Sequence, residues 1–267
     1  MTRQTRRLAL AGLLLLLAGA AALWVWGERE PAPGRANLAI AEDRSKLGLM
    51  TSLPIYWGEV GGVEDILAGA GEAGDPHWVR SALETEYRLV PLDTLAGGDG
   101  GIAGDLAALD YLLLAQPYTL TPAENVALDM WLRDGGRLLM FADPVLTEHS
   151  RFALGDRRRP QDIGLVSGVF ARWGLAQSYD EGQPAGLTDL RTGKLTVPVH
   201  RRGQFALLPE PPETGDRCFV GSAKLIAKCR IGEGHALIVA DAAMLEQPVT
   251  PVRSAAFKGL LETAFAR

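Results

Sequence analysis

Hydrophobic and polar positions along residues 120–144 predict a helix, a tight turn, a buried strand and an acidic turn, in that order. The start of the helix is strongly marked, because Thr121 is a suitable N-cap, Pro122 suits the first helical position and Glu124 completes a capping box. The helix is expected to end at Gly135, since glycine adopts the left-handed conformation at little cost. The rest of the chain can be arranged around this unit.

The strand that follows is apolar at every position from 138 to 142. A strand without polar alternation is typical of a parallel sheet that helices cover on both faces. Asp143 and Pro144 end the strand, because proline lacks the N–H that a ladder requires. Open α/β sheets bind their ligands at this carboxyl end of the strands. The pattern therefore predicts a fold class and also the edge of the sheet at which a site is expected.

Four more apolar runs predict strands, and helical spacing between them predicts connecting helices. The strands cover residues 46–53, 89–92, 111–115 and 236–240, and Pro91 favours an edge position for the second. One helix is expected to begin at Asp75 and Pro76. Two further helices are predicted from apolar residues at positions 165, 166, 169, 170 and 173 and at positions 257, 260, 261, 264 and 265.

Residues 177–217 differ from the rest, with short alternating segments in place of long apolar runs. Turn-forming residues interrupt them at positions 191–194 and 200–203, which predicts antiparallel hairpins. We therefore expect an α/β domain with an open, mostly parallel sheet flanked by helices and an antiparallel hairpin insertion.

The amino end holds an uncharged segment from Leu8 to Trp26, which is preceded by Arg3, Arg6 and Arg7. As a helix it is just long enough to cross a hydrocarbon core, and the arginines favour a cytoplasmic amino terminus. We expect a single-pass anchor in the inner (cytoplasmic) membrane, with the domain in the periplasm. A cleaved signal peptide is the open alternative, because the segment also has a suitable apolar core followed by small residues.

This pattern divides the chain into a membrane anchor or signal peptide (1–27), a linker (28–45) and an extracytoplasmic domain (46–267). The whole chain has a formal net charge of −5, of which the first segment contributes +3, which leaves −8 for the rest. This negative charge argues against a general surface for binding nucleic acid and against a surface for binding anionic membranes.

Cys218 and Cys229 are the only cysteines of the chain. In an oxidising compartment such a pair is expected to form a disulfide. Antiparallel register would place the two residues opposite each other, across a turn between Gly221 and Leu225. Two reduced thiols in the core are the open alternative.

Common sequence signatures of catalysis are missing from this chain. A phosphate-binding loop requires serine or threonine after Gly-Lys, but Gly193 and Lys194 are followed by Leu195. The sequence contains no G-x-S-x-G, and its four histidines lack the H-x-x-x-H spacing of a metal site. We therefore expect a non-enzymatic domain without a cofactor or a metal.

Polar and aromatic residues gather where the predicted strands end, and they are the candidate ligand-binding residues. They are Thr51, Ser52, Tyr56, Trp57, Gln116, Tyr118, Asp143 and Asp241. The two aspartates end buried strands, and two carboxylates in one crevice can serve as acid and base or bind a cation. The alternative is that both cap a following turn, in which case hydrogen bonds are expected to depress both pKa values.

Arginines gather in two of the predicted loops. They are Arg157, Arg158, Arg159, Arg201 and Arg202. Such a cluster suits a docking face for an acidic partner, and solvated surface charge is the alternative.

Three stretches of the chain resemble a known family, the auxiliary extracytoplasmic proteins of ABC-type uncharacterised transport systems, including the gliding-motility (GldG-like) group. The stretches are LDMWLRDGGRLLMFADP at 128–144, FARWGL at 170–175 and GEGHALIVAD at 232–241. The resemblance implies a class I glutamine amidotransferase-like, flavodoxin-like fold without the catalytic cysteine, and hence a non-enzymatic module.

Two functions are expected from these observations. The first is a membrane-anchored extracytoplasmic domain that works by binding, as an auxiliary component of an ABC-type transport system or of an envelope assembly complex. Its partners would be integral-membrane transporter or envelope proteins, and not nucleic acid. The alternative is an envelope hydrolase or sugar-binding enzyme that uses Asp143 and Asp241, with His149 on the adjoining loop.

Overall fold

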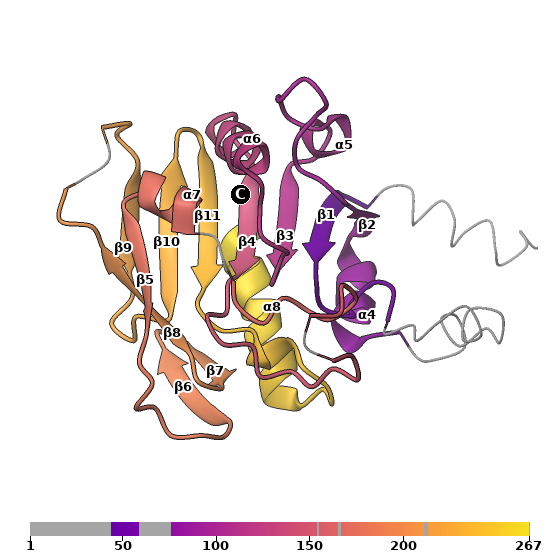
Figure 1. The fold of residues 1–267 in the computed structure, drawn as a ribbon, viewed down its shortest axis with the longest axis vertical. Coiled ribbons are helices and arrows are strands. Elements are labelled where there is room, and N and C mark those ends of the chain that lie inside the picture. The colour runs from indigo at the N-terminus through magenta and orange to yellow at the C-terminus, as the bar shows by residue number, and fades with distance from the viewer. Residues whose placement is uncertain (1–43, 59–75, 154, 165–166, 211–212, 267) are drawn as a thin grey trace, which may run out of the picture. The chain divides into compact units, whose positions relative to one another are not determined.

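The computed structural model describes residues 44–58, 76–153, 155–164, 167–210 and 213–266 (Figure 1). The chain divides into two units, Met1–Arg44 and Ser45–Arg267, and the described residues lie almost entirely in the second. The predicted membrane segment Leu8–Trp26 lies outside the described residues. Within the described part of the chain, no helix combines the length and the apolarity that crossing a membrane requires.

The domain is built on a seven-stranded sheet. In spatial order its strands are β2 (Arg88–Pro91), β1 (Lys46–Thr51), β3 (Tyr111–Ala115), β4 (Arg137–Phe141), β11 (Gly234–Val239), β10 (Ile226–Ile231) and β9 (Arg217–Val220). The strands from β2 to β11 pair in parallel, whereas β10 and β9 continue the sheet as antiparallel strands. The predicted α/β class, with a mostly parallel sheet, is confirmed, and the strand that contains Pro91 does lie at an edge.

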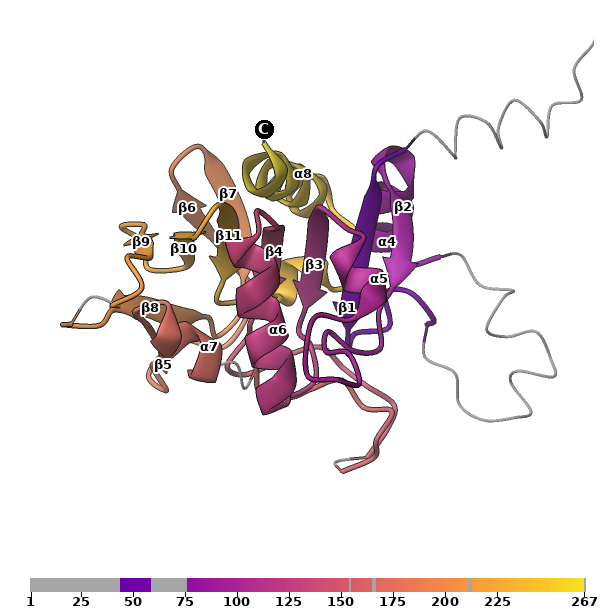
Figure 2. The same ribbon diagram turned by 90° about the horizontal axis from the view of Figure 1, so that it is seen from above.

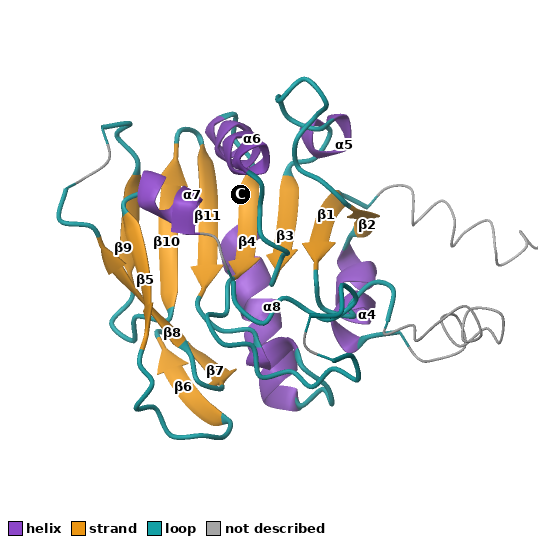
Figure 3. Ribbon diagram, viewed as in Figure 1, coloured by secondary structure: helices purple, strands orange, loops and turns teal. Residues whose placement is uncertain are grey.

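Helices and two small sheets complete the domain (Figure 3). The helices are α4 (Trp78–Glu86), α5 (Gly104–Ala107), α6 (Pro122–Arg133), α7 (Ser167–Arg172), the 3-10 helix η1 (Ala243–Leu245) and α8 (Pro251–Phe265). One small sheet pairs β5 (Leu175–Tyr179) with β8 (Gly203–Leu207), and the other pairs β6 (Thr188–Thr192) with β7 (Leu195–Val199).

The main sheet is buried on both faces, and alternate residues of β4 show this directly. Leu138 and Met140 belong to a core with residues of α5, α6, α7, β5 and β8, whereas Leu139 and Phe141 belong to a core with α4, α8 and β7. Figure 2 shows the corresponding layers on either side of the sheet. The continuous apolar run of β4 therefore reflects contact with two cores.

The unit formed by α6 and β4 matches its prediction closely. Thr121 Oγ1 accepts the N–H of Glu124 at 3.2 Å, and Glu124 Oε2 accepts the N–H of Thr121 at 2.9 Å, which completes the capping box. Gly135 has a φ of 108° after the last helical residue. Gly136 lies so close to the Trp131 ring that an added Cβ would be 2.5 Å from it. The glycine pair thus ends the helix and lets the strand start directly beneath an indole.

The start of α4 differs from the prediction, which placed it at Asp75 and Pro76. The helix begins at Trp78, and its N-cap is His77, whose Nδ1 accepts the N–H of Val79 at 3.2 Å. An unprotonated imidazole nitrogen can accept this bond, and burial lowers the pKa of His77 to about 4, which keeps the ring neutral. Histidine is not a usual capping residue, so this start is hard to recognise from the sequence.

The insertion also differs in its pairing. The turn at Gly193 and Lys194 joins β6 to β7 as predicted, but residues 200–203 do not form a second hairpin turn. β8 pairs with β5 instead, and the N–H of Gly203, its first residue, donates to the carbonyl of Ala240 at 2.7 Å, just beyond the end of β11. Local turn composition could not reveal this long-range pairing.

A disulfide joins Cys218 in β9 to Cys229 in β10, and the two residues lie directly opposite each other in the antiparallel ladder. The connecting turn includes Lys224 with a φ of 56°, and the N–H of Gly221 donates to the carbonyl of Ile226 at 3.0 Å. The bond therefore fixes the last strand of the sheet to its only neighbour in the sheet.

Candidate functional site

The main sheet has a topological switch point at β1, because β2 pairs with one side of β1 and β3 with the other. Ligands of open α/β sheets bind beyond the carboxyl ends of the strands at such a point. A cavity of about 620 Å³ lies there, between the ends of β1 and β2 and the loop at 152–160. We call it the strand-end cavity. Its lining includes five predicted ligand-binding residues and two predicted docking arginines, namely Thr51, Ser52, Tyr56, Trp57, Tyr118, Arg157 and Arg158.

The hydroxyl groups at the end of β1 are used to hold the backbone together. Thr51 Oγ1 donates to the carbonyl of Ala115 at 2.7 Å, and Ser52 Oγ donates to the carbonyl of Gln116 at 2.5 Å. Ser52 Oγ also accepts the N–H of Gln161 at 2.8 Å. Both residues line the cavity, but their hydroxyl protons are already engaged in joining β1 to β3.

Gln116 has a structural role as well, in contrast to its prediction as a ligand-binding residue. Its side chain is fully buried, and its Nε2 donates to the carbonyls of Asp143 (3.0 Å) and Gln161 (2.9 Å). Its Oε1 accepts the N–H of Asp143 at 2.8 Å. The amide therefore has its hydrogen bonds made within the protein, and it joins the ends of β3 and β4 to the loop that closes the cavity.

Asp143 and Asp241 end the adjacent strands β4 and β11, but neither side chain is exposed and neither lines the strand-end cavity. Asp143 accepts the N–H of Val145 at 2.9 Å and the N–H of Ala242 at 3.0 Å. Asp241 accepts the N–H of Ala243 at 2.8 Å and the N–H of His200 at 2.9 Å. These are the capping bonds that we considered as the alternative to catalysis.

The expected depression of both pKa values is nevertheless wrong. Burial raises the pKa of Asp143 to about 6, and the nearby Glu246 carboxylate acts in the same direction. Burial and the charge of Asp143 raise the pKa of Asp241 well above its usual value. The N–H donors oppose these effects without cancelling them, because loss of water penalises a charged carboxylate more than two backbone donors favour it.

The exposed part of the cavity lining is aromatic and cationic. Trp57 is 69% exposed and Tyr118 is 42% exposed, and the Trp57 ring lies edge-on to Tyr56 at 4.7 Å between centroids. The backbone carbonyl of Arg157 accepts the hydroxyl of Tyr118 at 3.3 Å, while the Arg157 guanidinium has no partner among the described residues. Asp93 is the one acidic residue among the described residues of the lining. These groups are accessible to a ligand.

The other predicted docking arginines differ in the contacts that their side chains make within the protein. Arg158 pairs with Asp156 at 2.8 Å and lies over the Phe152 ring, and Arg159 pairs with Asp162 at 2.9 Å. Arg202 donates to the carbonyl of Ala223 at 3.0 Å. Arg201 is exposed and has a φ of 57°.

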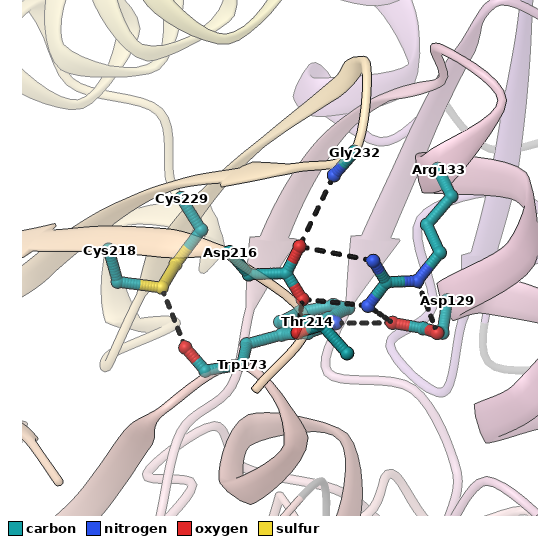
Figure 4. The surroundings of a disulfide bond; sticks show 8 residues. All are labelled: Asp129, Arg133, Trp173, Thr214, Asp216, Cys218, Cys229 and Gly232. Carbon is teal, nitrogen blue, oxygen red and sulfur yellow. Dashed lines mark hydrogen bonds and ion pairs between the residues drawn. A yellow bond between two sulfur atoms is a disulfide. The ribbon is translucent and has the colours of Figure 1, made fainter. Parts of the chain in front are cut away.

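An ion-pair network that the sequence did not indicate joins several elements behind the disulfide (Figure 4). Arg133, at the end of α6, lies 2.9 Å from Asp129 and 2.7 Å from Asp216. The indole of Trp173 donates to Asp129 at 2.9 Å, and the N–H of Gly232 donates to Asp216 at 3.3 Å. Burial tends to raise the pKa values of the two aspartates, but these hydrogen bonds and the Arg133 charge hold them below the usual value. The network connects α6, α7, the start of β9 and the β10–β11 turn.

The described residues contain no group of three or more histidines, cysteines and carboxylates that could hold a metal ion. Among its described lining residues, the strand-end cavity combines one carboxylate with arginines and aromatic rings. The arrangement is suited to binding a small polar ligand by stacking and charge, and among its described lining residues there is no pair of groups positioned for acid–base chemistry.

No protein-family model matches this chain, and no curated protein matches its sequence. Similar solved structures include a cold-adapted β-galactosidase from Rahnella sp. R3, with a TM-score of 0.41 and 11% identity over 83% of this chain and 31% of that chain. A β-galactosidase from Bacillus circulans sp. alkalophilus has a TM-score of 0.43 and 11% identity over 82% and 31% of the two chains. A ThuA-like protein from Bacteroides uniformis has a TM-score of 0.41 and 9% identity over 84% and 93%. This chain thus spans less than a third of either galactosidase, and similarity at this level carries no argument about function.

Proposed function

We propose that this chain is a membrane-anchored extracytoplasmic domain that works by binding, as an auxiliary component of an ABC-type transport system or of an envelope assembly complex. The observation that carries the proposal is the lining of the strand-end cavity. Its accessible groups are aromatic rings, the Arg157 guanidinium, which has no partner among the described residues, and the Asp93 carboxylate, whereas the carboxylates of Asp143 and Asp241 lie outside it and are fully buried. Such a lining favours binding over acid–base catalysis.

The fold type belongs to the same proposal. The order β2-β1-β3-β4-β11, with all five strands parallel, is the order of flavodoxin-like sheets. It supports a flavodoxin-like, glutamine amidotransferase-like domain. No cysteine lies at its strand ends, since Cys218 and Cys229 are in β9 and β10 and bonded to each other.

The cellular location is proposed from the sequence. The uncharged segment Leu8–Trp26 and the arginines before it support an inner-membrane anchor with the domain in the periplasm. The Cys218–Cys229 bond supports the same location, because disulfides persist in oxidising compartments and are rare in the cytosol.

The alternative, an envelope hydrolase or sugar-binding enzyme that uses Asp143 and Asp241, has less support. A general acid or base must come within hydrogen-bond reach of its substrate. Each of these carboxylates already accepts two backbone N–H bonds and has no exposed surface.

Recovery of partners from membranes tests the proposed role. The full chain is purified from membranes in several mild detergents, beside a control chain in which residues 8–26 are replaced by an unrelated single-pass segment. We expect both chains to recover integral-membrane proteins, because the extracytoplasmic domain makes the contact. A clean monomer without associated protein in every detergent contradicts the proposal. Asp143→Asn and Asp241→Asn are expected to leave recovery unchanged, and loss of a measured hydrolytic activity in these variants would favour the enzyme.

Ligand binding tests the cavity. Intrinsic tryptophan fluorescence is followed while monosaccharides and their phosphate esters are added, because these probes combine flat apolar faces with hydroxyl or anionic groups. We expect Trp57→Ala to abolish the response and Arg157→Ala to weaken the binding of the phosphate esters about tenfold. Leu187→Ala and Arg191→Ala are matched controls, since both residues are exposed and lie outside the cavity. Equal responses in all four variants would exclude the cavity as the binding site.

A further inference from the structure

A second concave surface lies at the opposite edge of the main sheet, between α8 and the edge strand β9. It consists of two adjoining hollows of about 650 and 330 Å³, which share Phe219, Lys228, Leu237 and Thr263 in their linings. We call this continuous surface the β9 groove. Gly259 of α8 and Lys194 of the β6–β7 turn close one end of it, and Arg217 lies in the lining of the other hollow.

The backbone of β9 is available along this groove. β9 pairs with β10 on one side and has no strand on the other, and residues 217–220 make no further backbone hydrogen bond to a described residue. An edge strand of this kind offers N–H and C=O groups to an incoming extended segment. The disulfide between Cys218 and Cys229 holds the strand in place, so that little ordering is required when a segment pairs with it.

The charge of the groove is opposite to that of the chain. Its lining has four cationic side chains, Lys194, Arg217, Lys228 and Arg230, and one carboxylate, Glu262. The whole chain has a net charge of −5. Arg230 lies 3.8 Å from Glu233, and Glu262 lies 4.0 Å from Lys258. The side chains of Lys194, Arg217 and Lys228 have no hydrogen-bond or ion-pair partner among the described residues. Three cations are therefore free to meet acidic groups.

An apolar side chain lies between these cations. Phe219 is 66% exposed, and it lies directly opposite Lys228 in the β9–β10 ladder. Arg217 lies two residues before Phe219, and therefore on the same face of the strand. The face presents a cation, an aromatic ring and a second cation within one short stretch of sheet.

We propose that the β9 groove binds an extended acidic segment of a partner protein, which pairs with β9 as an eighth strand of the sheet. Alternate side chains of the segment would meet the groove, with carboxylates near Arg217 and Lys228 and an apolar side chain against Phe219. A second copy of this chain is a poor occupant, because pairing of β9 with itself brings like charges together. The proposal does not depend on the strand-end cavity, which lies at the ends of β1 and β2.

A labelled synthetic peptide tests the proposal on the full chain in neutral detergent. The probe is fluorescein-Glu-Val-Glu-Val-Glu-Val, and its binding is measured by fluorescence anisotropy at low and high salt. We expect saturable binding that weakens as ionic strength rises. Two companion peptides separate the sources of affinity: Lys in place of Glu reverses the charge, and N-methylation of alternate amides blocks strand pairing while the charge is kept. We expect neither companion to bind. Equal binding of the N-methylated peptide would overturn strand addition.

Variants on the two edges of the sheet locate the site. Arg217→Glu and Lys228→Glu are each expected to weaken peptide binding about tenfold, and Phe219→Ala to weaken it severalfold. Arg88→Glu is the matched control, because Arg88 is an exposed cation on β2, the other edge strand, and this variant should bind as the unaltered chain does. Equal losses in Arg88→Glu and Arg217→Glu would overturn the assignment.

Hydrogen exchange on the unaltered chain tests the proposal without any substitution, so the result does not depend on whether a variant folds. The peptide is expected to slow exchange of the amides of Cys218 and Val220, which point away from β10, and to leave those of β2 unchanged. Unchanged exchange in β9 at saturating peptide overturns the proposal. An oligonucleotide that displaces the peptide and binds more tightly would also overturn it, because the groove would then be a general polyanion site.

Discussion

The carboxylate of Asp143 accepts the backbone N–H of Ala242 at 3.0 Å, so the end of β4 is tied to the residue that follows Asp241 at the end of β11. Two buried carboxylates therefore lie at neighbouring strand ends, and the charge of one raises the pKa of the other. Buried, coupled carboxylates of this kind have consequences for stability that can be measured.

We predict that the folded domain loses stability as pH rises from about 4 to about 6, because Asp143 and Asp241, with raised pKa values, together outweigh the buried His77, whose pKa of about 4 makes the opposite contribution over the same range. The pKa of Asp143 is about 6 in the folded state and 3.8 in an ordinary setting, so the folded state binds more protons than the unfolded chain in this range. A shift of this size corresponds to about 3 kcal/mol. Asp129 and Asp216 have depressed pKa values, so their contributions to stability are lost only as pH falls below about 4.

Urea unfolding at several pH values checks this prediction. Asp143→Asn is expected to flatten the profile between about pH 4 and pH 6, because the contribution of Asp143 is removed and those of Asp241 and His77 have opposite signs. Asp189→Asn is the control, since Asp189 is exposed on β6, and it should keep the original profile. An Asp143→Asn profile that keeps the slope of the unaltered protein would show that the N–H donors of Asp143 offset the effect of its burial.

Arg133→Ala is predicted to destabilise the domain by about 3 kcal/mol, because it removes the cation beside the buried carboxylate of Asp216 and leaves Asp129 paired with Arg172 alone. Lys258→Ala is the control, because its pair with Glu262 is exposed and should contribute about 1 kcal/mol or less. Chemical denaturation measures both. A loss below about 1 kcal/mol in Arg133→Ala would mean that water enters the network and solvates the two aspartates.

The disulfide is predicted to stabilise the domain by about 2 to 3 kcal/mol, because it closes a short loop in the unfolded chain. The double variant Cys218→Ser, Cys229→Ser should show this loss in thermal or urea unfolding. Thiol labelling of denatured, unreduced protein from the envelope provides an independent check. Two reactive thiols per chain would contradict the bond and also the proposed oxidising location.

Gly234→Ala is predicted to destabilise the domain by about 3 kcal/mol, because an added Cβ would overlap the carbonyl oxygen of Leu132, a backbone atom that cannot move aside easily. Gly98→Ala is the matched control, since the space around its Cβ position is empty, and it should change stability little. Differential scanning calorimetry distinguishes the two. Equal melting temperatures would indicate that α6 can shift away from β11.

Much of the fold could be predicted from local signals. The capping residues of α6, the apolar runs of the parallel strands and the antiparallel placement of Cys218 and Cys229 all act through residues close in sequence. The pairing of β8 with β5 was missed because nothing in a short turn specifies a distant partner. The unusual N-cap at His77 was missed because its capping depends on burial of the imidazole, which is set by tertiary packing.

The candidate site was predicted less completely than the fold. Trp57, Tyr118 and Arg157 do share one cavity, because the carboxyl ends of parallel strands meet at one edge of the sheet. Gln116 and Asp143 also follow the ends of strands, yet their side chains form hydrogen bonds to backbone groups and do not face the cavity. Sequence alone does not distinguish a strand-end side chain that faces a cavity from one that is covered by the next loop, because that choice depends on long-range packing.

The position of β11 has a consequence for the order in which the protein is made. β11 lies between β4 and β10, so the outer edge of β4, which ends at Phe141, stays unpaired until residues 234–239 have been synthesised. The nascent chain therefore carries an apolar strand with one open edge while residues 142–233 are synthesised and, if exported, while they are translocated. Such a strand invites wrong pairing and is a target for chaperones. A chain truncated before residue 234 should accordingly aggregate, even though the helices and strands of its first half can form.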